Sequence, residues 1–89
     1  MARLEISQLG AVTHIDGGTK TDSLYELGLV YATGRDTDVD LISAHKWFNL
    51  AAMRGNENAK RYRKEIASEM SRQEVAKAQR EAREWLSKH

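Results

Sequence analysis

The chain has 89 residues, a net charge of +1, no cysteine and no proline. This length supports one small domain with a modest core, to whose stability a partner or a second copy would add. The lack of cysteine excludes disulfides, thiolate metal sites and cysteine nucleophiles, and the near-neutral charge gives no bulk attraction to nucleic acid or to a membrane. The chain begins with Met-Ala-Arg and has no long apolar run, so we expect no signal peptide, no transmembrane helix and a cytoplasmic location.

Residues 1–20 fit neither a helical nor a strand template well. Leu4 and Ile6 alternate with polar residues, and the pair Gly17-Gly18 is typical of a flexible joint. We therefore predict an irregular or flexible N-terminal arm over residues 1–20.

The spacing of apolar residues predicts a first helix over residues 24–33. Either Asp22 or Ser23 is expected to cap it, with Glu26 as the partner in a capping box. Its inner face is expected to hold four residues at helical spacing: Leu24, Leu27, Gly28 and Tyr31. Because apolar residues also cover much of its remaining surface, this helix is predicted to be the most buried one.

A glycine inside this helix, Gly28, predicts that a second helix crosses closely over it. Glycine in a helix costs about 1 kcal/mol relative to alanine, and a close backbone approach is the usual reason for accepting that cost. The second helix is expected over residues 41–54, with Asp40 as its cap. Gly34 and Gly55 are expected to end the two helices. Small residues and large partners are expected to meet at the crossing: Ala44, Ala51 and Ala52 with Tyr31, Trp47 and Phe48.

The spacing of these residues resembles the Sel-one-like repeat (SLR), a helix-turn-helix repeat related to the tetratricopeptide class. The matching positions run without a gap over residues 27–59: Leu27, Gly28, Tyr31, Gly34, Asp40, Ala44, Trp47, Ala51, Ala52, Gly55, Asn56 and Ala59. The sequence departs from the family at Asp36 and Thr37, where Gly and Val are usual, and at Ser23, where Ala is usual. The resemblance implies an all-α superhelical scaffold that binds other proteins and performs no chemistry.

Two further helices are predicted after this repeat, over residues 57–70 and from residue 72 to about residue 87. Ser71 and Glu74 form the S-x-x-E pattern of a capping box, which places a sharp boundary between them. Each helix has one apolar stripe, made of Ala59, Tyr62, Ile66 and Met70 in the first and of Val75, Ala78, Ala82 and Trp85 or Leu86 in the second. This pair lacks the repeat's signature residues, so residues 57–89 are predicted as a diverged capping pair behind a repeat over residues 21–56.

No catalytic, metal or cofactor site is predicted. Asp36, Asp38 and Asp40 mimic the start of a calcium loop, but Leu41 and Trp47 stand where that loop needs Gly and Glu. An acidic capping loop is the simpler interpretation. The three histidines, His14, His45 and His89, do not have the spacing of metal ligands. His45 is expected to be a half-exposed surface residue on the second helix.

The predicted function is a small SLR adaptor or scaffold for protein–protein contact, with possible self-association. Residues 21–55 carry a net charge of −2 and residues 56–89 a net charge of +3, which favours head-to-tail association. Trp85 is the candidate anchor for a partner. The alternative is nucleic-acid binding by the basic residues of the last two helices, which acidic residues interrupt: Arg61, Arg63, Lys64, Arg72, Lys77, Arg80 and Arg83.

Overall fold

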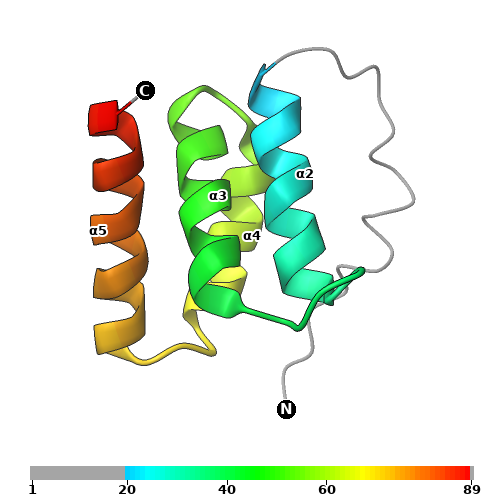
Figure 1. Ribbon diagram of the computed structural model, residues 1–89, viewed down its shortest axis with the longest axis vertical. Coiled ribbons are helices and arrows are strands. Elements are labelled where there is room, and N and C mark those ends of the chain that lie inside the picture. The colour runs from blue at the N-terminus through cyan, green and yellow to red at the C-terminus, as the bar shows by residue number, and fades with distance from the viewer. Residues whose placement is uncertain (1–19, 89) are drawn as a thin grey trace.

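A computed structural model describes residues 20–88 of the chain, with side chains from residue 23 onward. Four α-helices make up this part and no strand occurs within it, as predicted: α2 (Lys20–Thr33), α3 (Leu41–Met53), α4 (Glu57–Ala67) and α5 (Arg72–Lys88). Figure 1 shows α2, α3 and α5 standing side by side. The predicted arm over residues 1–20 lies almost wholly outside the described residues.

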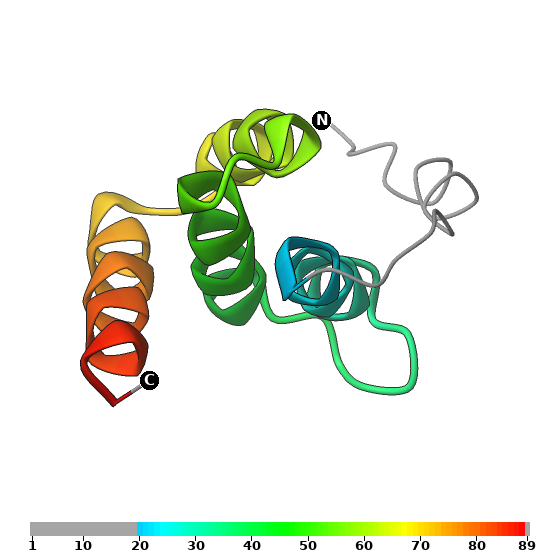
Figure 2. The ribbon, with the colours of Figure 1, turned by 90° about the horizontal axis from the view of Figure 1, so that it is seen from above.

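The helix α3 is the centre of the molecule. It packs against α2, α4 and α5, and Figure 2 shows these three helices standing on different sides of it. Six of its residues are buried: Ala44, His45, Phe48, Leu50, Ala51 and Ala52. The prediction that the first helix is the most buried is therefore wrong, because α3 faces three neighbours and α2 packs mainly against one.

The crossing of α2 and α3 is built on Gly28, as predicted. A Cβ atom at this position would lie 2.5 Å from Cδ1 and Cε1 of Phe48, closer than real side chains approach. The Phe48 side chain is 0% exposed, and its ring also packs against Tyr25, with ring centroids 5.8 Å apart. Glycine is needed here because it gives the Phe48 ring its space. Of the three aromatics proposed for the crossing, Phe48 fills it, while Tyr31 and Trp47 are half-buried and pack against the core.

The start and the facing of α2 differ from the predictions. The helix begins at Lys20, so Asp22 and Ser23 lie inside it and neither is the cap; Glu26 is not a capping-box partner. Leu27 is 38% exposed and not part of the inner face. It lies two residues from both Tyr25 and Leu29, which are buried, and a two-residue step leads to the opposite side of a helix.

The loop between α2 and α3 uses two left-handed residues. Gly34 ends α2 with φ of +76°, as predicted, and its N–H donates to the carbonyl of Val30 at 2.9 Å. Asp36 is the one non-glycine residue in the described part of the chain with positive φ, at +62°. This is the position where the resembled family carries glycine, and the backbone angle gives the reason, since glycine adopts it without steric cost.

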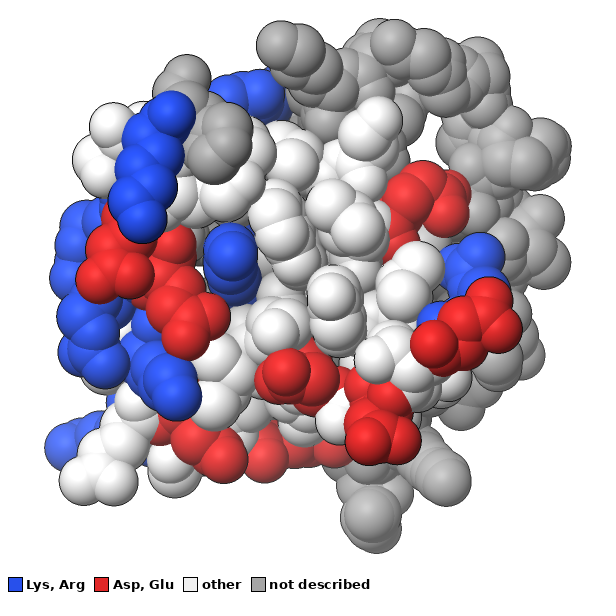
Figure 3. Space-filling model, viewed as in Figure 1, with Lys and Arg blue, Asp and Glu red and all other residues white. Residues whose placement is uncertain are grey.

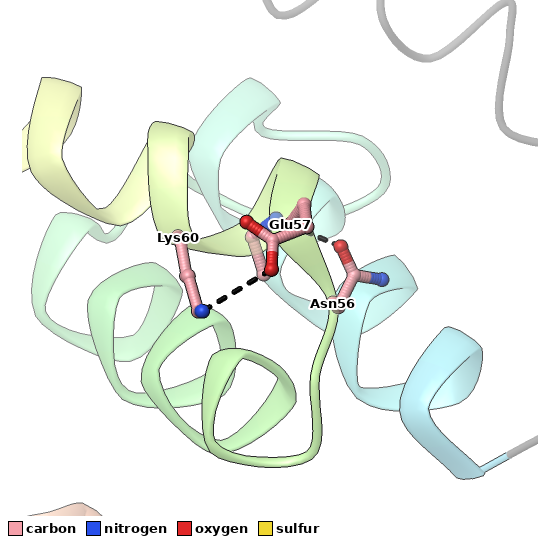
Figure 4. A network of polar contacts seen from close by, with 4 residues as sticks. Asn56, Glu57 and Lys60 are labelled. Carbon is pink, nitrogen blue, oxygen red and sulfur yellow. Dashed lines mark hydrogen bonds and ion pairs between the residues drawn. The ribbon is translucent and has the colours of Figure 1, made fainter.

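Side-chain caps begin the other helices. The Asp40 carboxylate accepts from the Ser43 N–H at 3.1 Å, which confirms it as the cap of α3. At the start of α4, Asn56 Oδ1 accepts from the Ala59 N–H at 2.8 Å, and Lys60 pairs with Glu57 at 3.2 Å (Figure 4). The bonds to Asp40 and Asn56 satisfy N–H groups that a helix leaves without a partner in its first turn.

The boundary between α4 and α5 is the predicted capping box. The Ser71 N–H donates to Glu74 Oε1 at 2.8 Å, and the Glu74 N–H donates to Ser71 Oγ at 3.0 Å. However, α4 ends at Ala67 and not at residue 70. The N–H groups of Ser68, Glu69 and Met70 each bond to the carbonyl three residues earlier, so the chain tightens into a turn before the box begins.

Candidate partner-binding surface

One face of the helical stack, over α2 and α3, is largely uncharged. Figure 3 shows this face between the mixed charges over α5 and a row of acidic side chains along the lower edge. On α2, Leu27 is 38% exposed and Tyr31, one helical turn later, is half-buried. In a helical repeat protein such a face is normally covered by the neighbouring repeat or by a partner.

An aromatic pair joins α3 to α5. The rings of Trp47 and Trp85 meet edge-to-face, with centroids 5.7 Å apart, and Lys46 Nζ lies 4.4 Å from the Trp47 ring centroid. The predicted anchor Trp85 is thus half-buried and takes part in the α3–α5 contact. It also borders a shallow hollow of about 250 Å³ with Lys46 and with Glu81 and Glu84.

A buried polar cluster lies between α3 and α4. His45 is only 3% exposed, so the prediction of a half-exposed surface residue is wrong. Its Nδ1 atom has no hydrogen-bond partner among the described residues, and burial followed by the nearby Arg63 cation lowers the pKa of the imidazole. One turn further along α3, Asn49 Oδ1 accepts a hydrogen bond of 2.6 Å from Arg63 Nη1. The imidazole is therefore held in its neutral form at pH 7.

A buried hydroxyl lies between α2 and α4. The Tyr25 side chain is buried against Phe48, and its hydroxyl has no hydrogen-bond partner within residues 20–88. Burial, with a smaller contribution from Tyr62, raises the pKa of the Tyr25 hydroxyl. The group therefore stays protonated at neutral pH.

The basic residues proposed for nucleic acid are partly occupied by internal contacts. Arg63 is half-buried and bonded to Asn49, and Arg61 lies over the ring of Tyr62, 5.4 Å from its centroid. Figure 3 shows red and blue side chains mixed over α5, which agrees with the acidic interruptions seen in the sequence. Nucleic-acid binding stays an untested alternative.

A groove at the lower end of the molecule joins segments that are far apart in sequence. It has a volume of about 550 Å³ and lies between the end of α2, the start of α3 and the turn that leads into α5. Its lining is Tyr31, Thr37, Asp38, Val39, Asp40, Leu41, Ile42, Glu69 and Glu74. From the sequence, only the acidic pair Asp38 and Asp40 could be recognised as neighbours. Nothing in the local sequence indicates that residues 69 and 74 line the same groove.

Within residues 20–88 the structure provides no set of three or more histidine or acidic side chains able to hold a metal ion. In the same part of the chain, no helix combines the length and apolar character needed to cross a membrane. The carboxylates of Asp36, Asp38 and Asp40 lie in the acidic loop before α3, where Asp40 serves as a helix cap.

These features define an α-helical repeat protein whose helices are arranged around one central helix. The sequence profile of the Sel1 repeat family matches residues 21–56 and 69–88, and the chain belongs to this family. The first matched range contains α2 and α3 up to the cap of α4, and the second contains α5 with its preceding turn. Comparisons with curated proteins and with solved structures gave no match. The family match identifies Sel1 repeats, which generally bind proteins, and no catalytic domain is identified.

Proposed function

We propose that the chain is a small adaptor or scaffold that binds another protein, or a second copy of itself, in the cytoplasm and has no catalytic role. The observation that carries this proposal is the largely uncharged face over α2 and α3 (Figure 3). We assign to this face the apolar Leu27 side chain of α2, which is 38% exposed. Repeat units bury such faces against neighbours, and this one is left without a helix among the described residues. A partner that covers it would remove apolar surface from water, which is the main source of association free energy.

The edge of this face supplies aromatic surface as well. Trp47 and Trp85 form a rigid edge-to-face pair, and a half-buried tryptophan needs little ordering when a partner covers it. Trp85 therefore acts both as a link between α3 and α5 and as part of the proposed binding face.

The test compares two variants that add the same charge at different places. Leu27→Glu changes the proposed face, and Gln73→Glu changes an exposed residue near the start of α5. Wild-type and variant chains are used to capture proteins from a lysate of the source cells, and each is sedimented alone to measure self-association. We expect Leu27→Glu to abolish capture or self-association while Gln73→Glu retains it.

Equal behaviour of the two variants, with both folded by circular dichroism, would contradict this assignment of the face. A chain that sediments as a monomer and retains no protein from the lysate would argue against an adaptor role altogether.

A further inference from the structure

We propose that the groove below α2 and α3 binds an extended, positively charged segment of the partner protein. This inference rests on the adaptor function proposed above and assigns it a second contact surface with a defined chemistry. Its elements are a hollow of about 550 Å³, apolar side chains open to that hollow, and a uniform charge sign around it.

The apolar part of the groove is open to solvent. Val39 is 57% exposed although its neighbours in the groove, Tyr31, Leu41 and Ile42, are half-buried. The Val39 side chain leans on Gly34, since its Cγ2 atom lies 3.0 Å from where a Cβ would stand on that glycine. An exposed valine beside a tyrosine offers a surface that an aliphatic side chain can cover.

Among the residues that the structure describes, the charged side chains that line the groove are all acidic. Four carboxylates line the groove, and no lysine or arginine does: Asp38, Asp40, Glu69 and Glu74. Asp40 and Glu74 are partly neutralised by the helix starts that they cap. The side-chain carboxylates of Asp38 and Glu69 form no ion pair or hydrogen bond with any residue that the structure describes. These two carboxylates sit on opposite segments of the groove, one before α3 and one before α5.

The combination of apolar and acidic surface selects the side chain that fits. Lysine and arginine carry a long aliphatic stem with a cationic end, so the stem can cover Val39 while the cation meets Asp38 or Glu69. An anionic segment would face four like charges, and a wholly apolar one would leave the carboxylates without water or a partner. Charge complementarity therefore favours an extended basic segment as the occupant.

The experiment uses the full chain and a fluorescein-labelled nine-residue peptide in which arginine and leucine alternate with glycine. Binding is followed by anisotropy at low salt and mapped by amide chemical shifts. We expect saturable binding, weakened by salt, with the largest shifts at residues 37–42 and 69–74. A peptide with glutamate in place of arginine should not bind.

Matched variants separate this groove from general electrostatic attraction. Asp38→Asn with Glu69→Gln should weaken binding by about tenfold or more. Glu65→Gln with Glu84→Gln removes the same charge from exposed positions outside the groove and should leave the affinity within about twofold. Val39→Ser should weaken binding through the loss of apolar contact, and Leu27→Glu should leave peptide binding intact.

Three results would overturn the proposal: no saturable binding, equal weakening by both pairs of substitutions, or shifts spread over α5. If the wild-type chain self-associates and Asp38→Asn with Glu69→Gln abolishes this, the occupant is a second copy and not a partner segment. If the peptide does not bind the groove, the capture experiment with Leu27→Glu can still succeed. The groove proposal and the adaptor proposal can therefore be rejected independently.

Discussion

The pair α2–α3 and the pair α4–α5 are held together in different ways. The first two helices pack directly on each other, with Phe48 filling the space above Gly28. The last two helices contact α3 far more than they contact one another. On α5 only Ala78 and Ala82 are buried. The large side chain by which α5 packs against the core is the half-buried Trp85. The first pair is therefore a hairpin packed on itself, and its core continues into α4 and α5. The second pair depends on α3 for most of its burial.

This difference shows why the signature residues of the repeat gather in the first pair. A close helix crossing requires one particular residue at one particular place, such as Gly28 opposite Phe48. A helix that lies on its neighbour through alanines, as α5 does, tolerates many sequences with the same apolar stripe. Four predictions test the contrast, beginning with the largest expected effect.

Phe48→Ala should remove the centre of the α2–α3 hairpin. The side chain is 0% exposed, and such a truncation costs about 3–5 kcal/mol in a packed core. Urea unfolding monitored by circular dichroism should show loss of most of the stability, because a domain of this size has little in reserve. The contrast between the two pairs would fail if Trp85→Ala, at the edge of α5, cost as much.

Gly28→Ala should destabilise the chain by about 1–2 kcal/mol, although alanine is the better helix former by about 1 kcal/mol. The new Cβ atom would lie 2.5 Å from the Phe48 ring, so the ring or the helix must move. Thermal unfolding measures the loss. In a Phe48→Leu background the same glycine change should be neutral or stabilising, and a full cost in that background would show that the ring is not the cause.

Lowering the pH should weaken the contact between α3 and α4 through His45. Burial and the Arg63 cation lower the pKa of this imidazole below its ordinary value of 6.5. Below pH 6.5 the unfolded chain takes up a proton that the folded chain resists, so the free energy of unfolding falls until the folded-state pKa is passed. Urea unfolding at pH 7.5 and pH 5.5 should show this fall in the wild type and a smaller one in His45→Gln. An equal fall in both would assign the effect to other groups.

Asp36→Gly should stabilise the chain by about 0.5 kcal/mol. The left-handed backbone at φ +62° costs an L-residue more than the extra flexibility that glycine brings to the unfolded chain. Thermal unfolding is the measurement, and Asp38→Gly is the control, because no positive φ occurs there and this change should only destabilise. Loss of stability in Asp36→Gly would show that the aspartate is not strained.

The parts of the fold that rest on local chemistry could be predicted from the sequence. The caps Asp40 and Ser71, the helix-ending Gly34 and the crossing at Gly28 each depend on residues within one turn or on one helix pair. The start of α2 could not be predicted, because the good caps Asp22 and Ser23 are overridden by a helix that continues through them.

Features that depend on which helices meet could not be predicted. His45 looks like a surface residue in the sequence, and it is buried because α4 lies against that side of α3. The acidic groove needs the turn before α5 to come beside the loop before α3, and no periodicity in either segment indicates this. Leu27 matches the family pattern, yet in this chain its side chain is 38% exposed.

The placement of α3 between three other helices has a consequence for how such a protein can diversify. Each outer helix packs mainly on α3, so its outward residues can change with little effect on the other helices. A substitution in α3 affects the packing of all three neighbouring helices at once. New binding preferences are thus expected to arise by drift on the periphery, while Ala44, Phe48 and Ala51 tolerate almost no replacement.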